Sequence, residues 1–170
     1  MDLNQVERSK LVITRILNAP RELVFRVWTD PAHFGKWWGP KESKLEVARM
    51  EANPGGTFLG KFTDPDGGVM WSKFVYREIA PPEKLAFIQS FSDEDGNTIR
   101  APFDSRWPLE IMNILTLTQE EGDQTLLKLE VAPIDATDEE LAVFEGMHPS
   151  MQEGYKGTID QLADYLAAQQ

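Results

Sequence analysis

Residues 149–168 constrain the fold most, because they predict the only long amphipathic helix in the chain. Within residues 149–168, apolar side chains recur at helical spacing on one face: Met151, Tyr155, Ile159, Leu162 and Leu166. Residues 43–133 instead have the pattern of strands separated by turns. A sheet with one apolar face must bury that face, and this helix is the large apolar partner that the sequence offers. We therefore expect the sheet to curve around the helix, leaving room for a gap between them.

The strand pattern is clearest between residues 43 and 133. Six segments have it: SKLEVARMEA, GGTFLGKFTD, GVMWSKFVYREI, EKLAFIQSFS, LEIMNILTLTQ and QTLLKLEVAP. Turn-forming residues separate most of them, in NPGG, DPDGG, APPEK and EEGD. In the last segment, apolar residues at 127, 129 and 131 alternate with Lys128 and Glu130, which indicates one buried and one solvated face. These features predict an antiparallel meander.

Three further segments complete the expected order. LVITRILNA at residues 11–19 is typical of a first strand. After Pro20, RELVFRVWTD predicts a short helix that stops at Asp30 and Pro31, and a second helical turn or two should end at Gly39. Residues 92–108 have no clear period and predict a long connection that covers part of the fold. Thr137 and Glu140 form a capping-box pattern before the final helix.

Length and composition indicate one domain. With 170 residues, 41% of them hydrophobic, the chain can bury a full core, and we expect a single domain over residues 1–170 with its core at about 9–168. Cysteine is absent, which removes disulfides and thiolate chemistry and is compatible with a reducing cytosol.

The charge argues against a nucleic-acid partner. Seventeen Lys and Arg face 28 Asp and Glu, giving a formal charge of -11 that repels a phosphate backbone. The N-terminal MDLNQVERSK is polar, and no run of about 18 apolar residues occurs, so we expect no membrane span and a cytoplasmic location.

Several separated motifs resemble a known family. NAPRELVFRVWTDPAHFGKWWGP, NPGGTF, DPDG, YREIAPPEKLAF and SMQEGYKGTIDQLADYL are similar, in this order, to the START-like (SRPBCC) superfamily. Within it the chain resembles the family of the C-terminal domain of the activator of the heat-shock chaperone ATPase. The resemblance implies an α+β helix-grip fold: a curved antiparallel sheet of about six or seven strands around the C-terminal helix, with two short helices after the first strand and a hydrophobic cavity inside. Phe74 stands where many members have glycine, and Tyr155 where tryptophan is common.

Aromatic and thioether side chains are the candidates for the lining of this cavity. The adjacent Trp37 and Trp38 are too large to leave exposed, and they either seal the end of the core or supply, with Phe34, part of a cavity mouth. The full set of candidate ligand-binding residues is Phe34, Trp38, Phe58, Trp71, Phe87, Trp107, Met112, Met151 and Tyr155.

Other kinds of site have weaker support in the sequence. His33 and His148 lack metal-ligand spacing, and DPDGG and DEDGN fit ordinary Asp/Gly turns better than calcium loops, so we expect no metal and no cofactor. NPGG is not a phosphate loop, and no catalytic serine motif occurs. Polar groups that could perform acid-base chemistry in a cavity are Arg49, Gln89, Asn113 and Tyr155.

Three functions therefore stay open. The first is non-catalytic binding of a small hydrophobic or amphipathic molecule, because apolar side chains are abundant and no reactive constellation is evident. The second is an enzyme of the cyclase or hydrolase kind that uses the same cavity. The third, suggested by the family resemblance alone, is regulation of a chaperone ATPase. The sequence does not determine the oligomeric state.

Overall fold

The computed structural model describes residues 9–170. Most of the polar N-terminal segment considered above therefore lies outside the described residues. The strands are β1 (Leu11–Leu17), β2 (Lys44–Met50), β3 (Thr57–Thr63), β4 (Val69–Ala80), β5 (Lys84–Ser92), β6 (Thr98–Ile99), β7 (Ile111–Glu120) and β8 (Gln124–Pro133). The helices are α2 (Arg21–Thr29), α3 (Pro31–Phe34), α4 (Asp138–Gly146) and α5 (His148–Ala168), and the 3-10 turn η1 (Glu121–Asp123) joins β7 to β8.

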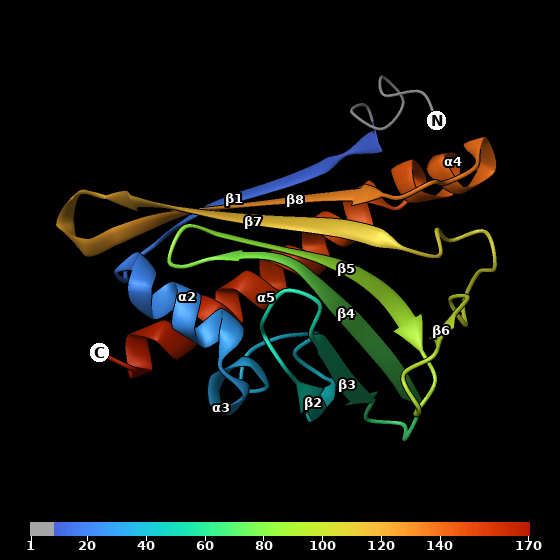
Figure 1. Ribbon diagram of the computed structural model, residues 1–170, viewed down its shortest axis with the longest axis horizontal. Helices are drawn as coiled ribbons and strands as arrows, with labels where there is room; N and C mark the ends of the chain where they lie inside the picture. Colours follow the sequence, from blue (N-terminus) through green and yellow to red (C-terminus); the bar gives the residue numbers. More distant parts are fainter. Residues whose placement is uncertain (1–8) are drawn as a thin grey trace.

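The strands form one antiparallel sheet in the order β1-β8-β7-β5-β4-β3-β2, with β6 paired to β5 (Figure 1). The sheet does not close into a barrel, because β1 and β2 remain at its two edges. Figure 1 shows α5 running diagonally behind the strands, so that the sheet and the long helix form two layers. The α+β helix-grip fold is thus confirmed.

Local sequence explains where the helices begin and end. Pro20 precedes α2 in an extended conformation, and Asp30 ends that helix and caps α3 by accepting a hydrogen bond from the Ala32 amide. The Thr137 hydroxyl and the Glu140 carboxylate form the expected capping box of α4. Only Met147 separates α4 from α5.

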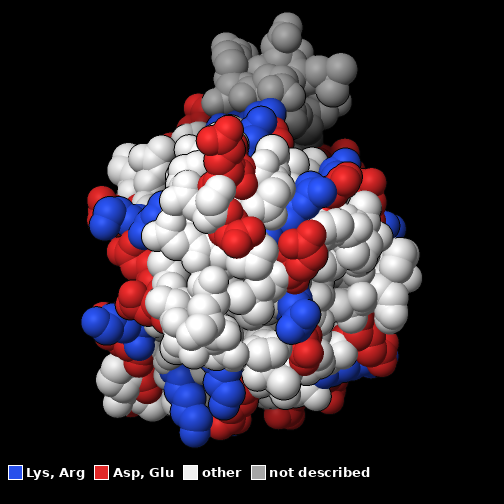
Figure 2. Space-filling model, turned by 90° about the vertical axis from the view of Figure 1, so that its left-hand side faces the viewer, with Lys and Arg blue, Asp and Glu red and all other residues white. Residues whose placement is uncertain are grey.

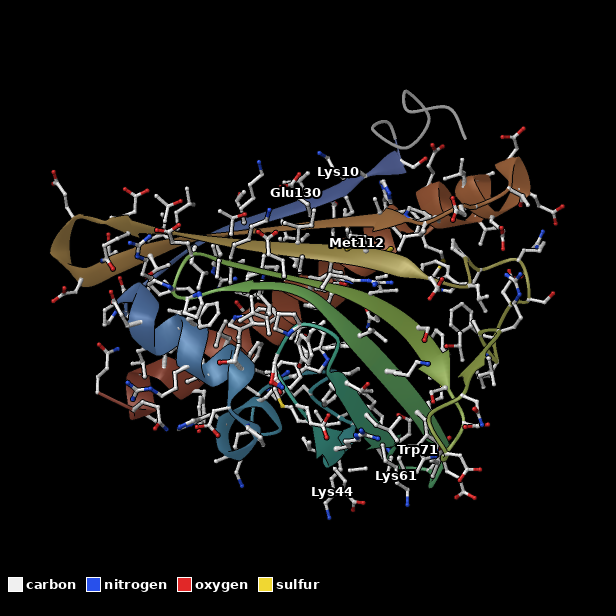
Figure 3. All side chains as sticks on the ribbon, viewed as in Figure 1. Lys10, Lys44, Lys61, Trp71, Met112 and Glu130 are labelled. Atoms are coloured by element: carbon white, nitrogen blue, oxygen red, sulfur yellow. The ribbon has the colours of Figure 1, made fainter. Side chains whose placement is uncertain are left out.

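Alternation along the strands separates a buried face of the sheet from a solvated one. On β8, Leu127, Leu129 and Val131 are fully buried and face α5. On the outer face, Glu130 forms an ion pair with Lys10 at 2.8 Å (Figure 3). The buried apolar residues of α5 close the layer from the other side: Ile159, Leu162 and Leu166.

An aromatic cluster fills the space between the sheet, α2 and α3. It consists of Trp28, Phe34, Trp37, Trp38, Phe58, Phe74, Tyr76 and Phe87. Ring centroids within it lie 4.1–6.4 Å apart, in tilted, T-shaped and stacked arrangements that favour aromatic contact. This part of the interior is solid.

The connection over residues 92–108 differs from the expectation in one respect. It contains β6, a two-residue strand that gives the sheet eight strands rather than six or seven. Two residues are too few for an alternating pattern, so the sequence could not reveal this strand.

The molecular surface carries both signs of charge. On the face shown in Figure 2, acidic and basic side chains are interspersed rather than gathered in one basic patch. Within residues 9–170, no helix is both long enough and apolar enough to cross a membrane.

Candidate functional site

A pocket of about 360 Å³ lies between the sheet and the first half of α5. Its apolar wall is formed by Trp38, Pro40, Phe62, Met70, Trp71, Phe91, Trp107, Pro108, Ile111, Val131 and Met151. Its polar wall is formed by Ser43, Asp64, Ser72, Gln89, Ser90, Tyr155 and Thr158, and Gly39 and Gly154 complete the lining. The volume is within the range of roughly 300–1,000 Å³ that is usual for small-molecule sites.

Helix α5 supplies one wall through residues four apart, Met151 and Tyr155, which lie on one helical face. Gly154 stands beside them at the exposed edge of the pocket. A Cβ atom added to Gly154 would have no atom within 4 Å, so this position opens onto free space. A larger side chain there would stand at the entrance.

The loop after α3 is held against α5 by two hydrogen bonds. The Gly39 carbonyl accepts from the Thr158 hydroxyl at 3.2 Å and from the Gln161 side-chain amide at 2.7 Å. Gly39 has φ +99°, a left-handed conformation that favours glycine. A Cβ atom on Gly39 would lie 2.4 Å from a ring carbon of Phe62, so only glycine allows this close approach.

The sequence left two roles open for the adjacent tryptophans, sealing the core or lining a cavity, and the structure gives one role to each. Trp37 is buried in the core and donates a hydrogen bond from its indole nitrogen to the Val27 carbonyl at 3.0 Å. Trp38 lines the pocket with one side and stacks on Phe34 with the other, at 5.3 Å between centroids. Trp37 therefore seals the core, and Trp38 separates the core from the pocket.

The connection between β6 and β7 closes another side of the pocket with Trp107 and Pro108. Trp107 packs against Phe144 of α4, with ring centroids 5.5 Å apart. Arg100 pairs with Glu140 at 2.5 Å, which attaches the start of this connection to the first turn of α4. The connection is thus fastened to α4 at two points.

A buried amide pair lies on the inner face of the sheet. Asn113 on β7 donates from Nδ2 to Gln89 Oε1 on β5 at 3.2 Å. Gln89 lines the pocket, whereas Asn113 is fully buried, and its Oδ1 atom has no hydrogen-bond partner in the described part of the chain. Burial raises the pKa of the Tyr155 hydroxyl, so this group stays protonated at neutral pH. The pocket therefore offers uncharged polar groups, and Tyr155 can donate a hydrogen bond.

Comparison with known proteins places this architecture in a family. The family model described as Activator of Hsp90 ATPase homolog 1-like protein matches residues 18–167. The chain belongs to this family. A comparison with functionally curated proteins gave no significant match.

Solved structures of other proteins share the fold of this chain. A crystal structure of a protein from Mycobacterium smegmatis is 26% identical with a TM-score of 0.76, covering 97% of this chain and 93% of the other. A solution structure from Arthrobacter aurescens is 24% identical with a TM-score of 0.79, covering 96% and 88%. A crystal structure from Nitrosomonas europaea is 22% identical with a TM-score of 0.76, covering 99% and 98%.

Five of the nine candidate ligand-binding residues of this family member border the pocket: Trp38, Trp71, Trp107, Met151 and Tyr155. Trp71 borders the pocket although it is not on the inner face of the sheet. Its neighbours Ser72 and Phe74 belong to alternating buried positions, so Trp71 itself points to the outer face. There it pairs across the strands with Lys61, as Figure 3 shows. Binding by these residues stays a prediction.

The other four candidates do not line the pocket. Phe34, Phe58 and Phe87 are buried in the aromatic cluster, which is packed solid. Met112 lies between the inward-facing Ile111 and Asn113, so it points to the outer face that also carries Glu130 (Figure 3). For Met112 the expectation placed the residue on the wrong face of its strand, because an apolar residue at a half-buried position does not reveal the strand's register.

The sequence argument missed several lining residues. Phe62 and Phe91 have the same strand parity as Phe58 and Phe87, so the alternation placed them on the inner face. Their distance from the aromatic cluster, which decides that they border open space, is a tertiary property. Thr158 and Gly154 could not be found, because their role depends on how α5 lies against Gly39.

The remaining sequence candidates have separate partners. His33 hydrogen-bonds through Nδ1 to the Tyr165 hydroxyl at 2.6 Å, and His148 through Nε2 to the Ser9 carbonyl at 2.8 Å. Arg49 is exposed and pairs with Glu51 at 3.4 Å. Within residues 9–170, no group of three or more metal-ligating side chains gathers.

The acidic turns use their carboxylates internally. Asp93 accepts hydrogen bonds from the backbone amide and the side chain of Asn97 and from the backbone amide of Asp95, and these bonds lower the pKa of Asp93. Asp66 accepts from the Gly68 amide at 2.9 Å. Both segments have the local hydrogen bonds of ordinary Asp/Gly turns.

Proposed function

We propose that this protein binds a small hydrophobic or amphipathic molecule in the pocket between the sheet and α5. The observation that carries the proposal is the pocket of about 360 Å³ and its largely aromatic, aliphatic and thioether wall. Such walls gain free energy from apolar contact, roughly 25 cal/mol for each Å² removed from water. A few polar groups beside them are the usual means of orienting a ligand.

The same wall favours binding over catalysis. Gln89 carries an amide that does not ionise at physiological pH, and Tyr155 stays protonated because burial raises its pKa still further above neutrality. Among the described lining residues, Asp64 is the one carboxylate, and it is exposed at the rim, where it accepts a hydrogen bond from Ser43 at 2.7 Å. The deeper groups can therefore orient a ligand, but they do not supply the base that a cyclase or hydrolase requires.

Regulation of a chaperone ATPase is the alternative that the family name raises. A pull-down with the host chaperone, combined with its ATPase rate, tests this alternative independently of the pocket. Retention together with a changed ATPase rate would favour it over the binding proposal.

The expected cytoplasmic location stays a prediction.

Two measurements test the binding proposal. Native mass spectrometry after mild purification should show a retained small molecule or saturable uptake of the neutral fluorophore Prodan. Titration of the purified protein with Prodan should give a blue-shifted, saturating emission, because the dye leaves water for an apolar wall. Absence of both retained mass and saturable uptake would contradict the proposal.

A pair of matched variants locates the site. Gly154 borders the pocket, whereas Gly157 does not; both are exposed helical glycines of α5 at which a Cβ atom would meet nothing within 4 Å. We expect Gly154→Leu to obstruct the entrance and to raise the Kd for Prodan by about tenfold, equivalent to 1.4 kcal/mol. Gly157→Leu should leave the Kd unchanged. Equal effects of the two substitutions would place the dye elsewhere.

A further inference from the structure

The described residues that line the pocket supply no counter-charge for an anionic ligand. Among the described residues that line it, none is Lys, Arg or His, and the one carboxylate is Asp64 at the rim. The nearby Lys61 belongs to the outer face of β3, because it alternates with the inward-facing Phe62. Transfer of a carboxylate from water to an apolar site without a paired cation is strongly unfavourable. The net charge of -11 on the protein also disfavours binding of an anion.

The interior of the pocket offers hydrogen-bond donors instead. Gln89 uses Oε1 to accept from Asn113, which leaves the two N–H groups of its Nε2 without a partner among the described residues. Gln89 pairs across the strands with the buried residues Phe74 and Ile111, so its side chain is on the inner face. The Tyr155 hydroxyl, on the opposite wall, is protonated and also has no described partner. Both groups border the same pocket, and each can donate a hydrogen bond to an acceptor on a ligand.

Asn113 supports a role for this pair in recognition. It is fully buried and its Oδ1 has no partner among the described residues, an arrangement that destabilises a folded protein. The side chain of Asn113 makes one hydrogen bond to the described residues; it goes to Gln89 and fixes which atom of that amide remains available to the pocket. A polar group that costs stability and orients another group is typical of a binding site rather than of a core.

From these observations we propose that the ligand is a compact, uncharged, mainly apolar molecule with a hydrogen-bond acceptor, such as a carbonyl oxygen, that Gln89 and Tyr155 bind. This inference rests on the proposed binding function and specifies its ligand class. The volume is near the lower end of the range for small-molecule sites, which favours a fused-ring or similarly compact molecule over a long acyl chain.

Three probes of nearly equal shape test the proposal on the wild-type protein. They are 2-acetylnaphthalene, which is neutral with a carbonyl acceptor; 2-ethylnaphthalene, which lacks the acceptor; and 2-naphthoate, which is anionic. Isothermal titration calorimetry at pH 7 should give the tightest binding for 2-acetylnaphthalene. We expect 2-ethylnaphthalene to bind about two- to tenfold more weakly, the effect of one neutral hydrogen bond. We expect 2-naphthoate to bind most weakly.

Variants then assign the preference to particular groups. Gln89→Leu combined with Asn113→Leu removes both amides and leaves no unpaired partner, so the fold should persist. We expect this double variant to prefer 2-acetylnaphthalene over 2-ethylnaphthalene less strongly than the wild type does, because only the Tyr155 donor remains. Tyr155→Phe keeps the ring in place. It should also lower the ratio of the affinity for 2-acetylnaphthalene to the affinity for 2-ethylnaphthalene. A ratio unchanged in both variants would overturn the assignment of the two donors.

The outcomes separate the two proposals. If none of the three probes binds, and Prodan is also not taken up, the binding function itself is wrong. If all three bind but 2-naphthoate binds as tightly as 2-acetylnaphthalene, binding stands and the selectivity for uncharged ligands is wrong. Thermal denaturation of each variant with no probe present establishes that the folded protein is being compared.

Discussion

The rings of Phe74 and Phe87 are stacked across neighbouring strands, with centroids 4.1 Å apart and planes 24° apart. Phe74 also contacts Trp38, whose other side borders the pocket. The space between sheet and helix is therefore divided into a solid aromatic part and an open part. Phe74, which replaces the glycine expected from the family resemblance, belongs to the solid part.

Removal of the Phe74 ring should extend the empty space behind Trp38. Phe74→Ala deletes a fully buried ring and should lower the free energy of unfolding by about 3–5 kcal/mol, measured by urea denaturation. If the protein remains folded, the variant should bind larger aromatic probes than the wild type. Phe103→Ala serves as the control, since Phe103 is 55% exposed. An equal loss of stability in both variants would contradict the division of the interior.

Gly39→Ala should destabilise the protein and weaken binding. The added Cβ would meet the Phe62 ring at 2.4 Å, and φ is +99°, so strain and a steric clash act together. The matched control is Gly67→Ala, where φ is +90° but nothing lies within 4 Å, so strain acts alone. We expect the control to cost about 1 kcal/mol of unfolding free energy and Gly39→Ala to cost clearly more. Only Gly39→Ala should raise the Kd for Prodan.

The two members of the buried amide pair should respond differently to substitution. Asn113→Leu removes a buried oxygen that has no partner among the described residues. The free energy of unfolding should therefore stay the same or rise. Gln89→Leu leaves Asn113 without its one hydrogen bond and should lower the free energy of unfolding by about 1–3 kcal/mol. Chemical denaturation of both single variants measures the difference. A loss of equal size in both would argue against the unpartnered Oδ1 atom.

Glu140 should contribute stability that is lost in acid. The hydrogen bond from the Thr137 amide and the Arg100 guanidinium hold the pKa of Glu140 below its ordinary value in the folded protein. Its contribution is therefore present above the unfolded pKa of about 4.3 and is lost as pH falls through the lower folded value. Glu140→Gln keeps an acceptor for the capping box but does not ionise. The difference in unfolding free energy between wild type and this variant should shrink from pH 6 to pH 3, and a constant difference would refute the assignment.

The sequence predicted the elements well, because their signals are local. Alternation of Leu127 and Leu129 with Lys128 specifies which face of β8 is buried, and Thr137 with Glu140 specifies where α4 begins. The sequence did not determine which residues of a strand face the helix where that choice depends on strand register. Met112 and Ile111 are adjacent and both apolar, and only strand pairing decides which of them faces the helix.

By itself, the sequence determined that one long amphipathic helix packs against a largely antiparallel sheet, because periodicity and turn chemistry act over a few residues. The tertiary structure alone decided that Phe58 and Phe87 lie in solid core while Phe62 and Phe91 border a pocket, although the two pairs share one strand parity. The reason is physical: whether a buried side chain meets another side chain or empty space depends on the distance between sheet and helix at that point. Contacts between residues far apart in the chain, such as Gly39 with Thr158, set that distance.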